Sequence, residues 1–220
     1  MSRFLDMLVF GGERRTLPRP PPPAWRRLFH VLAGSSIPLT GIFVSETSMI
    51  WALTVLAASG LALDLVRFRI ECLNLVFTRL LAPLLKEDEV AHITGATYMV
   101  IAAFFVFLIF GKDVAIPVMF FLSVGDPAAA MVGKDMPGPR LFGKSPFGTA
   151  AFIGGGCAVL ALLLAADGID YHRALWVGVI VAGLIELASI PPDDNLTIPL
   201  LAGAVTVSYT HLTLPTILLV

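Results

Sequence analysis

Long apolar stretches separated by short charged segments make up most of the chain from Leu28 to about Thr206. A helix that crosses a lipid bilayer needs about 20 predominantly apolar residues in succession. The pattern predicts about seven such helices, with the last one left open at its end: 28–45, 47–66, 93–110, 114–133, 147–166, 174–190 and one beginning near 196. We therefore expect an all-α fold, a polytopic transmembrane helix bundle.

The segment from Ile70 to Leu85 has a different pattern. Its polar and apolar residues separate onto opposite sides of a helix. One side carries Glu71, Asn74, Thr78 and Arg79, and the other carries Leu73, Val76, Phe77, Leu80 and Leu84. Such a helix is suited to lie in the membrane interface rather than to cross the bilayer.

Composition favours the same class of protein. Of the 220 residues, 57% are hydrophobic and only 14% are charged, and the mean hydropathy is +0.86. A soluble domain cannot bury so large an apolar fraction around one core. The net charge of −1 gives no indication of a nucleic-acid partner. Cys72 and Cys157 lack metal-ligand or redox spacing, and we interpret both as small apolar residues.

The basic residues orient the predicted bundle. If the N-terminus is cytoplasmic, 13 of the 15 Lys and Arg residues fall in cytoplasmic segments, and only Lys112 and Arg173 fall outside. This asymmetry follows the positive-inside rule. Residues 1–27 are rich in Arg and Pro and lack the features of a secretory signal. They are predicted to be a cytoplasmic tail held near anionic membrane lipids, and a transit peptide is the alternative. Residues 28–206 are then the membrane-embedded domain.

The C-terminal residues 207–220 have a separate interpretation. Val207 to Thr216 reads VSYTHLTLPT, and a back-translation of this string resembles a common sequencing adapter. We expect these residues to be an artefact, with the last span truncated after about Thr206. On this interpretation His211 has no function.

Acidic residues within or at the ends of the apolar stretches point to a functional site. They are Asp64, Asp126, Glu186, Asp193 and Asp194. An ionisable group in a membrane is costly and is by default a candidate for function. The predicted topology places all of these acids toward the cytoplasmic ends of the spans, so we expect the site on that face.

Predicted helix starts fall on the same face. Asp126 precedes a proline and is expected to cap a helix after a break at Gly125, while Ser145 and Asp194 open the fifth and seventh spans. Helix N-termini bind anions. Because carboxylates beside them would repel a phosphate unless a divalent cation bridges the two, the pattern predicts a nucleoside triphosphate with Mg²⁺. Lys144 would supply a point charge for phosphate oxygens.

Small residues near Asp126 extend this prediction. Ala130 and Gly133 follow it at four and seven positions, which puts a strip of small side chains along one helix face. A phosphate or another backbone could approach this strip closely.

Simpler structural interpretations stay open for most of these residues. Asp126 and Asn195 could be helix caps alone, Lys144 an interfacial anchor, and Asp64 an intrahelical partner of Arg67. His30 could be a hydrogen-bonded histidine in the interface. The glycines Gly95, Gly154, Gly155 and Gly156 are interpreted as helix-packing contacts.

Five short strings, in order along residues 26–200, resemble the CTP-dependent polyprenol kinase family, which includes dolichol kinase, phytol kinase and a CTP-dependent diacylglycerol kinase. The strings are Arg26-Arg27-Leu-Phe-His30-Val-Leu-Ala-Gly34, Glu89 with Thr94-Gly-Ala-Thr97, Gly125-Asp126-Pro-Ala-Ala with Gly133, Lys144-Ser145 with Gly148-Thr149, and Asp194-Asn-Leu-Thr-Ile-Pro199. The last is the most specific.

The resemblance implies phosphoryl transfer from CTP to the hydroxyl of a lipid alcohol at the cytoplasmic membrane face. Phytol, a polyprenol, dolichol or diacylglycerol would all fit. It implies Mg²⁺ held by Asp126 and Asp194, and catalytic roles for these two with Asn195 and Lys144. The nucleotide-binding residues would be Gly125, Gly133, Ser145, Gly148 and Thr149, and the supporting residues on the substrate side would be Arg27, His30, Asp64 and Glu186. For the general base, Asp194 ranks ahead of Asp126 and Glu186.

Two other functions stay open. A phosphatidate cytidylyltransferase would also need CTP, Mg²⁺ and intramembrane acids, but it would release pyrophosphate. A transporter could use broken helices and buried acids to bind a solute, although transporters usually consist of two related halves and this chain shows no internal repeat.

Overall fold

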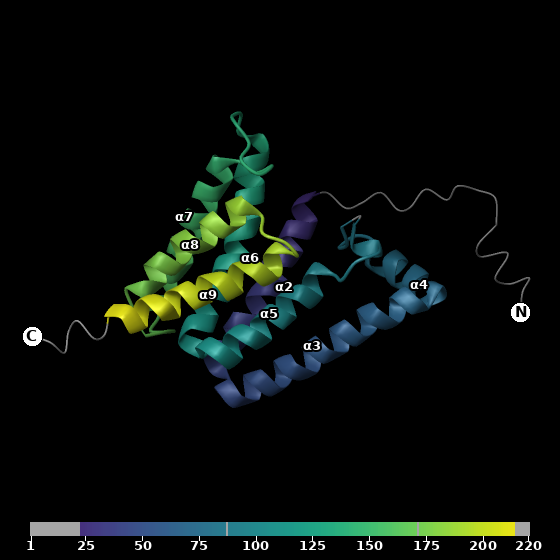
Figure 1. Ribbon diagram of the computed structural model, residues 1–220, viewed down its shortest axis with the longest axis horizontal. Coiled ribbons are helices and arrows are strands. Elements are labelled where there is room, and N and C mark those ends of the chain that lie inside the picture. Colours follow the sequence, from purple (N-terminus) through teal and green to yellow (C-terminus); the bar gives the residue numbers. More distant parts are fainter. Residues whose placement is uncertain (1–22, 87, 171, 214–220) are drawn as a thin grey trace, which may run out of the picture.

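The structure is a computed structural model that describes residues 23–86, 88–170 and 172–213 of the chain. Within these ranges it consists of helices and contains no strand (Figure 1). The helices are α2 (Pro23–Phe43), α3 (Glu46–Arg69), α4 (Glu71–Leu81), α5 (Gly95–Phe110), α6 (Lys112–Asp135), α7 (Pro146–Ala165), α8 (Ala174–Ala188) and α9 (Asp194–Thr213), with a single 3₁₀ turn at Asp88–Val90. The all-α prediction is confirmed for the described part of the chain.

Each predicted apolar stretch coincides with one helix. Three of the helices, α3, α6 and α7, are long and apolar enough to cross a membrane. Two further apolar helices, α5 and α8, are shorter, so the count of seven spans stays a prediction. Apolar side chains on α3 point outward, with Trp51 68% exposed and Val55 63% exposed, as expected of a surface in contact with lipid. Residues 1–22 of the predicted tail and 214–220 of the predicted artefact lie outside the described residues.

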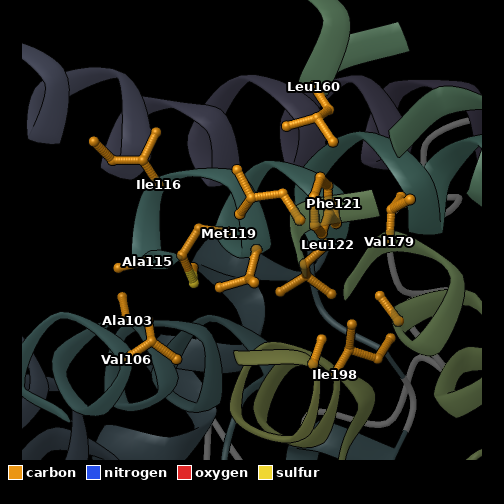
Figure 2. Close-up of a cluster of buried hydrophobic side chains, with 14 of the residues drawn as sticks. Ala103, Val106, Ala115, Ile116, Met119, Phe121, Leu122, Leu160, Val179 and Ile198 are labelled. Carbon is orange, nitrogen blue, oxygen red and sulfur yellow. The ribbon is translucent and has the colours of Figure 1, made fainter. Parts of the chain in front are cut away.

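Helix α6 is the centre of the bundle, because it packs against α2, α5, α7, α8 and α9. Figure 2 shows its side chains Ile116, Met119 and Phe121 within the apolar cluster, together with Leu160 of α7, Val179 of α8 and Ile198 of α9. The three side chains of α6 are fully buried. In a bundle surrounded by lipid, such contacts stabilise through van der Waals packing rather than through transfer from water. Because α6 is surrounded by the other helices, its polar residue Asp126 lies inside the bundle.

Helix α6 runs without interruption from Lys112 to Asp135, so the predicted break at Gly125 is wrong. Pro127 lies inside the helix, and Asp126 is a mid-helix residue rather than an N-cap. Proline is tolerated in the helices of membrane proteins when neighbouring helices hold the backbone in place. Such support is present here, because a Cβ at Gly125 would lie 2.9 Å from the Phe152 ring of α7.

The prediction of a helix in the segment 70–85 is confirmed, and the observed helix, α4, spans Glu71–Leu81. None of its residues is fully buried, and it packs against α3. Asn74 and Phe77 face the protein, since Asn74 accepts a hydrogen bond from Arg67 and the Phe77 ring lies against the same guanidinium. Leu80, by contrast, is 74% exposed. Exposed apolar side chains of this kind are compatible with a helix that contacts lipid.

Glycines allow close contact between the helices that carry the site. A Cβ at Gly148 of α7 would lie 2.9 Å from the carbonyl oxygen of Ala129 and 3.3 Å from Cα of Gly133, both on α6. The small-residue strip on α6 thus serves helix packing, as small residues commonly do in membrane bundles.

The two glycines Gly154 and Gly156 of α7 test this packing. A Cβ at Gly156 would collide with the Val179 side chain of α8, whereas a Cβ at Gly154 meets nothing within 4 Å. We expect Gly156→Ala to destabilise the bundle by about 1–3 kcal/mol through overpacking. Gly154→Ala should be neutral or slightly stabilising because alanine favours the helix.

Thermal unfolding of both variants in the same detergent measures the difference. Equal melting temperatures for Gly154→Ala and Gly156→Ala would contradict the packing described for α7 and α8.

Candidate active site

The candidate residues gather at one end of the bundle, because successive helices run in alternating directions. The N-terminal ends of α2, α5, α7 and α9 lie there together with the C-terminal parts of α3, α6 and α8. Figure 1 shows the loops that join α6 to α7 and α8 to α9 on the side away from the start of α3. The prediction that the acids share one end is therefore supported, while the cytoplasmic orientation of that end stays a prediction.

A polar cavity of about 360 Å³ lies between α6, α7 and α8. Its lining combines small residues with charged ones: Asp126, Ala129, Ala130, Gly133, Lys134, Arg140, Gly143, Lys144, Ser145, Gly148 and Glu186. Three of its five charged residues are basic, and two, Asp126 and Glu186, are acidic. The absence of bulky side chains on α6 and at the start of α7 leaves backbone available to a ligand.

A tight turn positions Lys144 in this cavity. Leu141 and Lys144 exchange backbone hydrogen bonds of 2.8 and 2.9 Å. The two residues between them, Phe142 and Gly143, have φ of 51° and 83°. Positive φ at both central positions is typical of the two-residue turns that close a hairpin, and glycine adopts it without strain. The turn brings Lys144 to the start of α7.

Lys144 is the centre of an ionic network that joins three segments. Its Nζ lies 2.6 Å from Oδ2 of Asp194 and 2.9 Å from Oε1 of Glu186. The other carboxylate oxygen of Glu186 accepts a hydrogen bond of 3.1 Å from Thr149. Burial disfavours the charge of Lys144, but the hydrogen bonds and charges of the two acids outweigh burial and raise the pKa of the lysine. Lys144 is therefore a permanent cation at the cavity wall.

The turn between α8 and α9 supplies the acids. Asp193 caps α9, because its Oδ1 accepts hydrogen bonds from both the backbone and the side-chain nitrogen of Asn195, at 2.8 and 2.7 Å. Its Oδ2 lies 3.8 Å from Nζ of Lys86. Ser145, by contrast, makes no side-chain capping bond at the start of α7. The predicted cluster of three capped N-termini is thus wrong, since Asp193 caps α9 and α6 has no N-terminus here.

A second, larger cavity of about 510 Å³ lies between α2, α3, α4, α5 and α6. Much of its wall is apolar, including Ile37, Leu63, Phe77 and Met99. Polar residues gather at the end nearest the site, where Arg27, His30, Lys86 and Asn195 line it. An apolar body with a polar end would fit this shape.

Asp126 and Ala130 line both cavities. Asp126 therefore stands where the polar space meets the apolar space. Its carboxylate is half-buried and makes no hydrogen bond or ion pair with any residue that the structure describes. Because an unpaired carboxylate in such surroundings is costly, Asp126 is a strong candidate for ligand binding.

Asp64, by contrast, belongs to a saturated structural network. Its Oδ1 lies 2.7 Å from Nε of Arg67, and its Oδ2 accepts a hydrogen bond of 3.1 Å from the backbone of Thr94. Glu89 accepts hydrogen bonds from the backbone of Gly95 and of Lys86, at 2.7 and 2.8 Å. Both acids thus fix the start of α5.

Arg67 is the donor that ties this network together. It is fully buried, and its guanidinium donates to the carbonyls of Glu89 and His92 at 2.8 and 2.6 Å and to Oδ1 of Asn74 at 2.8 Å. It also lies over the Phe77 ring at 4.6 Å. Cation–π contacts and multiple hydrogen bonds compensate a buried guanidinium. Arg67 therefore holds α3, α4 and the 86–94 segment in one arrangement.

The structure brings most of the predicted residues to the two cavities. The polar cavity contains Asp126, Gly133, Lys144, Ser145, Gly148 and Glu186, and the apolar cavity contains Arg27, His30, Asp64, Asp126 and Asn195. The remaining predicted residues line neither cavity. Gly125 packs against Phe152, Thr149 donates a hydrogen bond to Glu186, and Asp194 accepts one from Lys144. Their roles in catalysis and binding stay predictions.

Sequence reasoning missed three basic residues. Lys134 and Arg140 line the polar cavity, although the sequence indicated for them only a role in the orientation of the protein. Both residues flank a loop with two prolines and a glycine and lie close to Lys144 in the sequence. This proximity could have indicated that they belong to the same site as Lys144. Arg67 was considered only as a partner of Asp64, and its contacts with residues 22 and 25 positions away could not be read from helical spacing.

No protein-family model matches the chain, and no solved structure matches it significantly. Among curated proteins, the chain is similar to a protein described as CTP-dependent diacylglycerol kinase 1, from Saccharomyces cerevisiae, with 27% identity over 114 residues. The match covers 50% of this chain and 38% of the yeast protein, so it spans well under half of that relative. It supports, in broad form, the resemblance to CTP-dependent lipid kinases.

Arg67 and Arg69 offer a matched pair of substitutions on α3. Arg67→Ala would leave the buried Asp64 carboxylate and two carbonyls without their donor, and we expect it to lower the free energy of unfolding by about 3–5 kcal/mol. Arg69 is exposed, so Arg69→Ala should change stability by less than about 0.5 kcal/mol.

Chemical or thermal unfolding of the purified variants measures both effects. A melting temperature for Arg67→Ala equal to that of Arg69→Ala would show that the Arg67 network does not stabilise the fold.

Proposed function

We propose that this protein transfers the γ-phosphoryl group of CTP to the hydroxyl of a membrane lipid alcohol. The main observation in support is that Asp126 lines both the polar cavity and the apolar cavity. A kinase for lipid alcohols needs this arrangement, because a charged nucleotide and an apolar acceptor must meet at one point. The similarity to a protein described as a CTP-dependent diacylglycerol kinase supports the proposal and the choice of CTP.

The polar cavity is the proposed site of the triphosphate. Lys134, Arg140 and Lys144 line it, together with Gly133 and Gly148 at the contact between α6 and α7. Phosphoryl transfer depends mainly on positioning and on neutralisation of the charge on the transferred group. Lys144 is held in place by Asp194 and Glu186, so its ammonium is oriented before the nucleotide binds.

The apolar cavity is the proposed site of the lipid acceptor. Its apolar walls on α2, α3, α4 and α5 suit a hydrocarbon body, and the hydroxyl would lie at the polar end, near Asp126. The adjoining helix α4 exposes Val76 and Leu80. A lipid could therefore reach the cavity from the membrane interface without crossing water. Phytol, polyprenols, dolichol and diacylglycerol all combine such a body with a hydroxyl.

The residues of the polar cavity fit a magnesium ion that arrives with the nucleotide. Mg²⁺ is usually held by one or two carboxylates together with substrate phosphates and water. Asp126 offers an unpaired carboxylate, whereas within the described ranges no group of three or more His, Cys, Asp or Glu side chains could hold a metal alone. Asp126 would be the principal protein ligand. Asp194, the other predicted ligand, is bonded to Lys144. Bound Mg²⁺ would neutralise charge that develops on the phosphates.

The pairing of the acids also bears on the general base. Asp194 ranked first from sequence, but both Asp194 and Glu186 are bonded to Lys144. The carboxylate oxygen of each acid that accepts this bond would have to release Lys144 before it could take a proton. A base at the end of the lipid cavity is therefore an alternative to Asp194.

A product assay tests the proposal. Purified protein in lipid nanodiscs is supplied with CTP labelled at the γ-phosphate, Mg²⁺ and single lipid alcohols. We expect label in the lipid and release of CDP. Formation of a CDP-lipid with release of pyrophosphate from a lipid phosphate would instead identify a cytidylyltransferase. Absence of either reaction with every alcohol and with phosphatidate would contradict the proposal.

Asp126→Asn and Asp135→Asn are a matched pair on α6. Asp126→Asn keeps the size of the side chain but removes its charge, so we expect the rate of phosphoryl transfer to fall by about a hundredfold or more. Asp135 is exposed and lines neither cavity, so Asp135→Asn should retain the wild-type rate.

The assay with γ-labelled CTP gives both rates, and the melting temperature of each variant shows that it is folded. Wild-type activity in Asp126→Asn would refute the role proposed for Asp126.

A further inference from the structure

The imidazole of His30 has a buried nitrogen without a partner. Its Nε2 is the one buried side-chain nitrogen or oxygen, among the residues that the structure describes, that makes no hydrogen bond. Buried polar atoms in proteins are hydrogen-bonded in the great majority of cases, and an exception costs about 1–3 kcal/mol. The exception at His30 therefore calls for a ligand or a function.

His30 lies on the face of α2 that lines the lipid cavity. Arg27, His30, Gly34 and Ile37 recur at helical spacing, and all four line that cavity. Gly34 lets α2 approach α6 closely, since a Cβ there would lie 2.9 Å from Cβ of Ser123. The ring of His30 is thus part of the same cavity wall as Asp126.

Two of the other groups of this cavity that could accept a proton, Asp64 and Glu89, are engaged. Both carboxylate oxygens of Asp64 and both of Glu89 accept hydrogen bonds. Arg27 and Lys86 are cations and cannot accept one. Asp126 faces the polar cavity as well, where its charge is needed for the nucleotide and its metal. Beside Asp126, Nε2 of His30 is thus an acceptor without a partner in the lipid cavity, and it is the one that is buried.

We propose that Nε2 of His30 accepts the hydrogen bond of the lipid hydroxyl and takes its proton during transfer. This inference rests on the proposed function. In the reaction the O–H bond of the alcohol breaks and its proton moves to Nε2, a bond forms between the alcohol oxygen and the γ-phosphorus, and the bond from that phosphorus to the β-phosphate oxygen breaks to release CDP. A neutral imidazole has one acceptor nitrogen, as this step requires.

The acceptor would select for a hydroxyl group. An unpaired Nε2 in an apolar cavity disfavours an empty or purely hydrocarbon occupant and favours one that donates a hydrogen bond. A lipid phosphate in its ionised form has no such donor. His30 would therefore favour alcohols over lipid phosphates as acceptors, which is the distinction between a kinase and a cytidylyltransferase.

The experiment compares His30→Ala and His30→Gln with Leu32→Ala, in nanodiscs, with γ-labelled CTP and the lipid alcohol that the wild type phosphorylates best. Leu32 is also on α2 but is 63% exposed and lies outside the cavity. We expect both His30 variants to lose about a hundredfold or more in the rate at saturating substrates, with an unchanged KM for CTP. Leu32→Ala should keep the wild-type rate.

Chemical rescue separates proton transfer from a packing role. Added imidazole should restore part of the activity of His30→Ala, whereas pyrazole, which has the same size but is a far weaker base, should not. Equal restoration by the two compounds, or a near wild-type rate in His30→Ala or His30→Gln, would overturn the proposal for His30 while leaving the kinase assignment intact. A wild-type protein that phosphorylates no lipid alcohol would overturn the kinase assignment itself, and the His30 proposal with it.

Discussion

The cost of placing charge inside an apolar bundle is the constraint on which the site depends. The buried charged residues at this end of the bundle, Asp64, Arg67, Glu89 and Glu186, are all hydrogen-bonded or ion-paired. Arg67 satisfies Asp64 and the carbonyls that precede α5, and Lys144 satisfies Glu186 and Asp194. These two networks leave Asp126 without a partner, at the boundary between the polar and the apolar cavity. Compensation elsewhere thus allows the bundle to keep one carboxylate available for a ligand.

The two networks also explain how distant segments form one site. Lys144 joins the turn before α7 to α8 and to the start of α9, and the Lys144–Asp194 bond connects residues 50 positions apart. Arg67 joins α3 to α4 and to the segment before α5, and so shapes the wall of the lipid cavity. Each network thus supports one cavity, and α6 separates the two cavities with small residues on its surface.

The sequence was sufficient for the positions of the helices and for most of the site, because apolar runs and intramembrane acids depend on local chemistry alone. It was misleading at Gly125, where Gly-Asp-Pro is typical of a helix start in water. In the bundle, Phe152 packs over Gly125 and the helix continues. The pairing of Lys144, the network of Arg67 and the place of Arg140 in the polar cavity depend on contacts far apart along the chain. Helical periodicity carries no information about such contacts.

The central claim is that Asp126 separates a nucleotide site from a lipid site. A structure of the protein in nanodiscs, determined with Mg²⁺, a CTP analogue that cannot transfer its γ-phosphate and a lipid alcohol, tests it most directly. We expect phosphate density among Gly133, Lys144 and Gly148, and the alcohol in the cavity lined by α2 to α6, with its hydroxyl next to Asp126. Nucleotide and alcohol bound on the same side of Asp126, or a nucleotide bound away from Lys144, would contradict it.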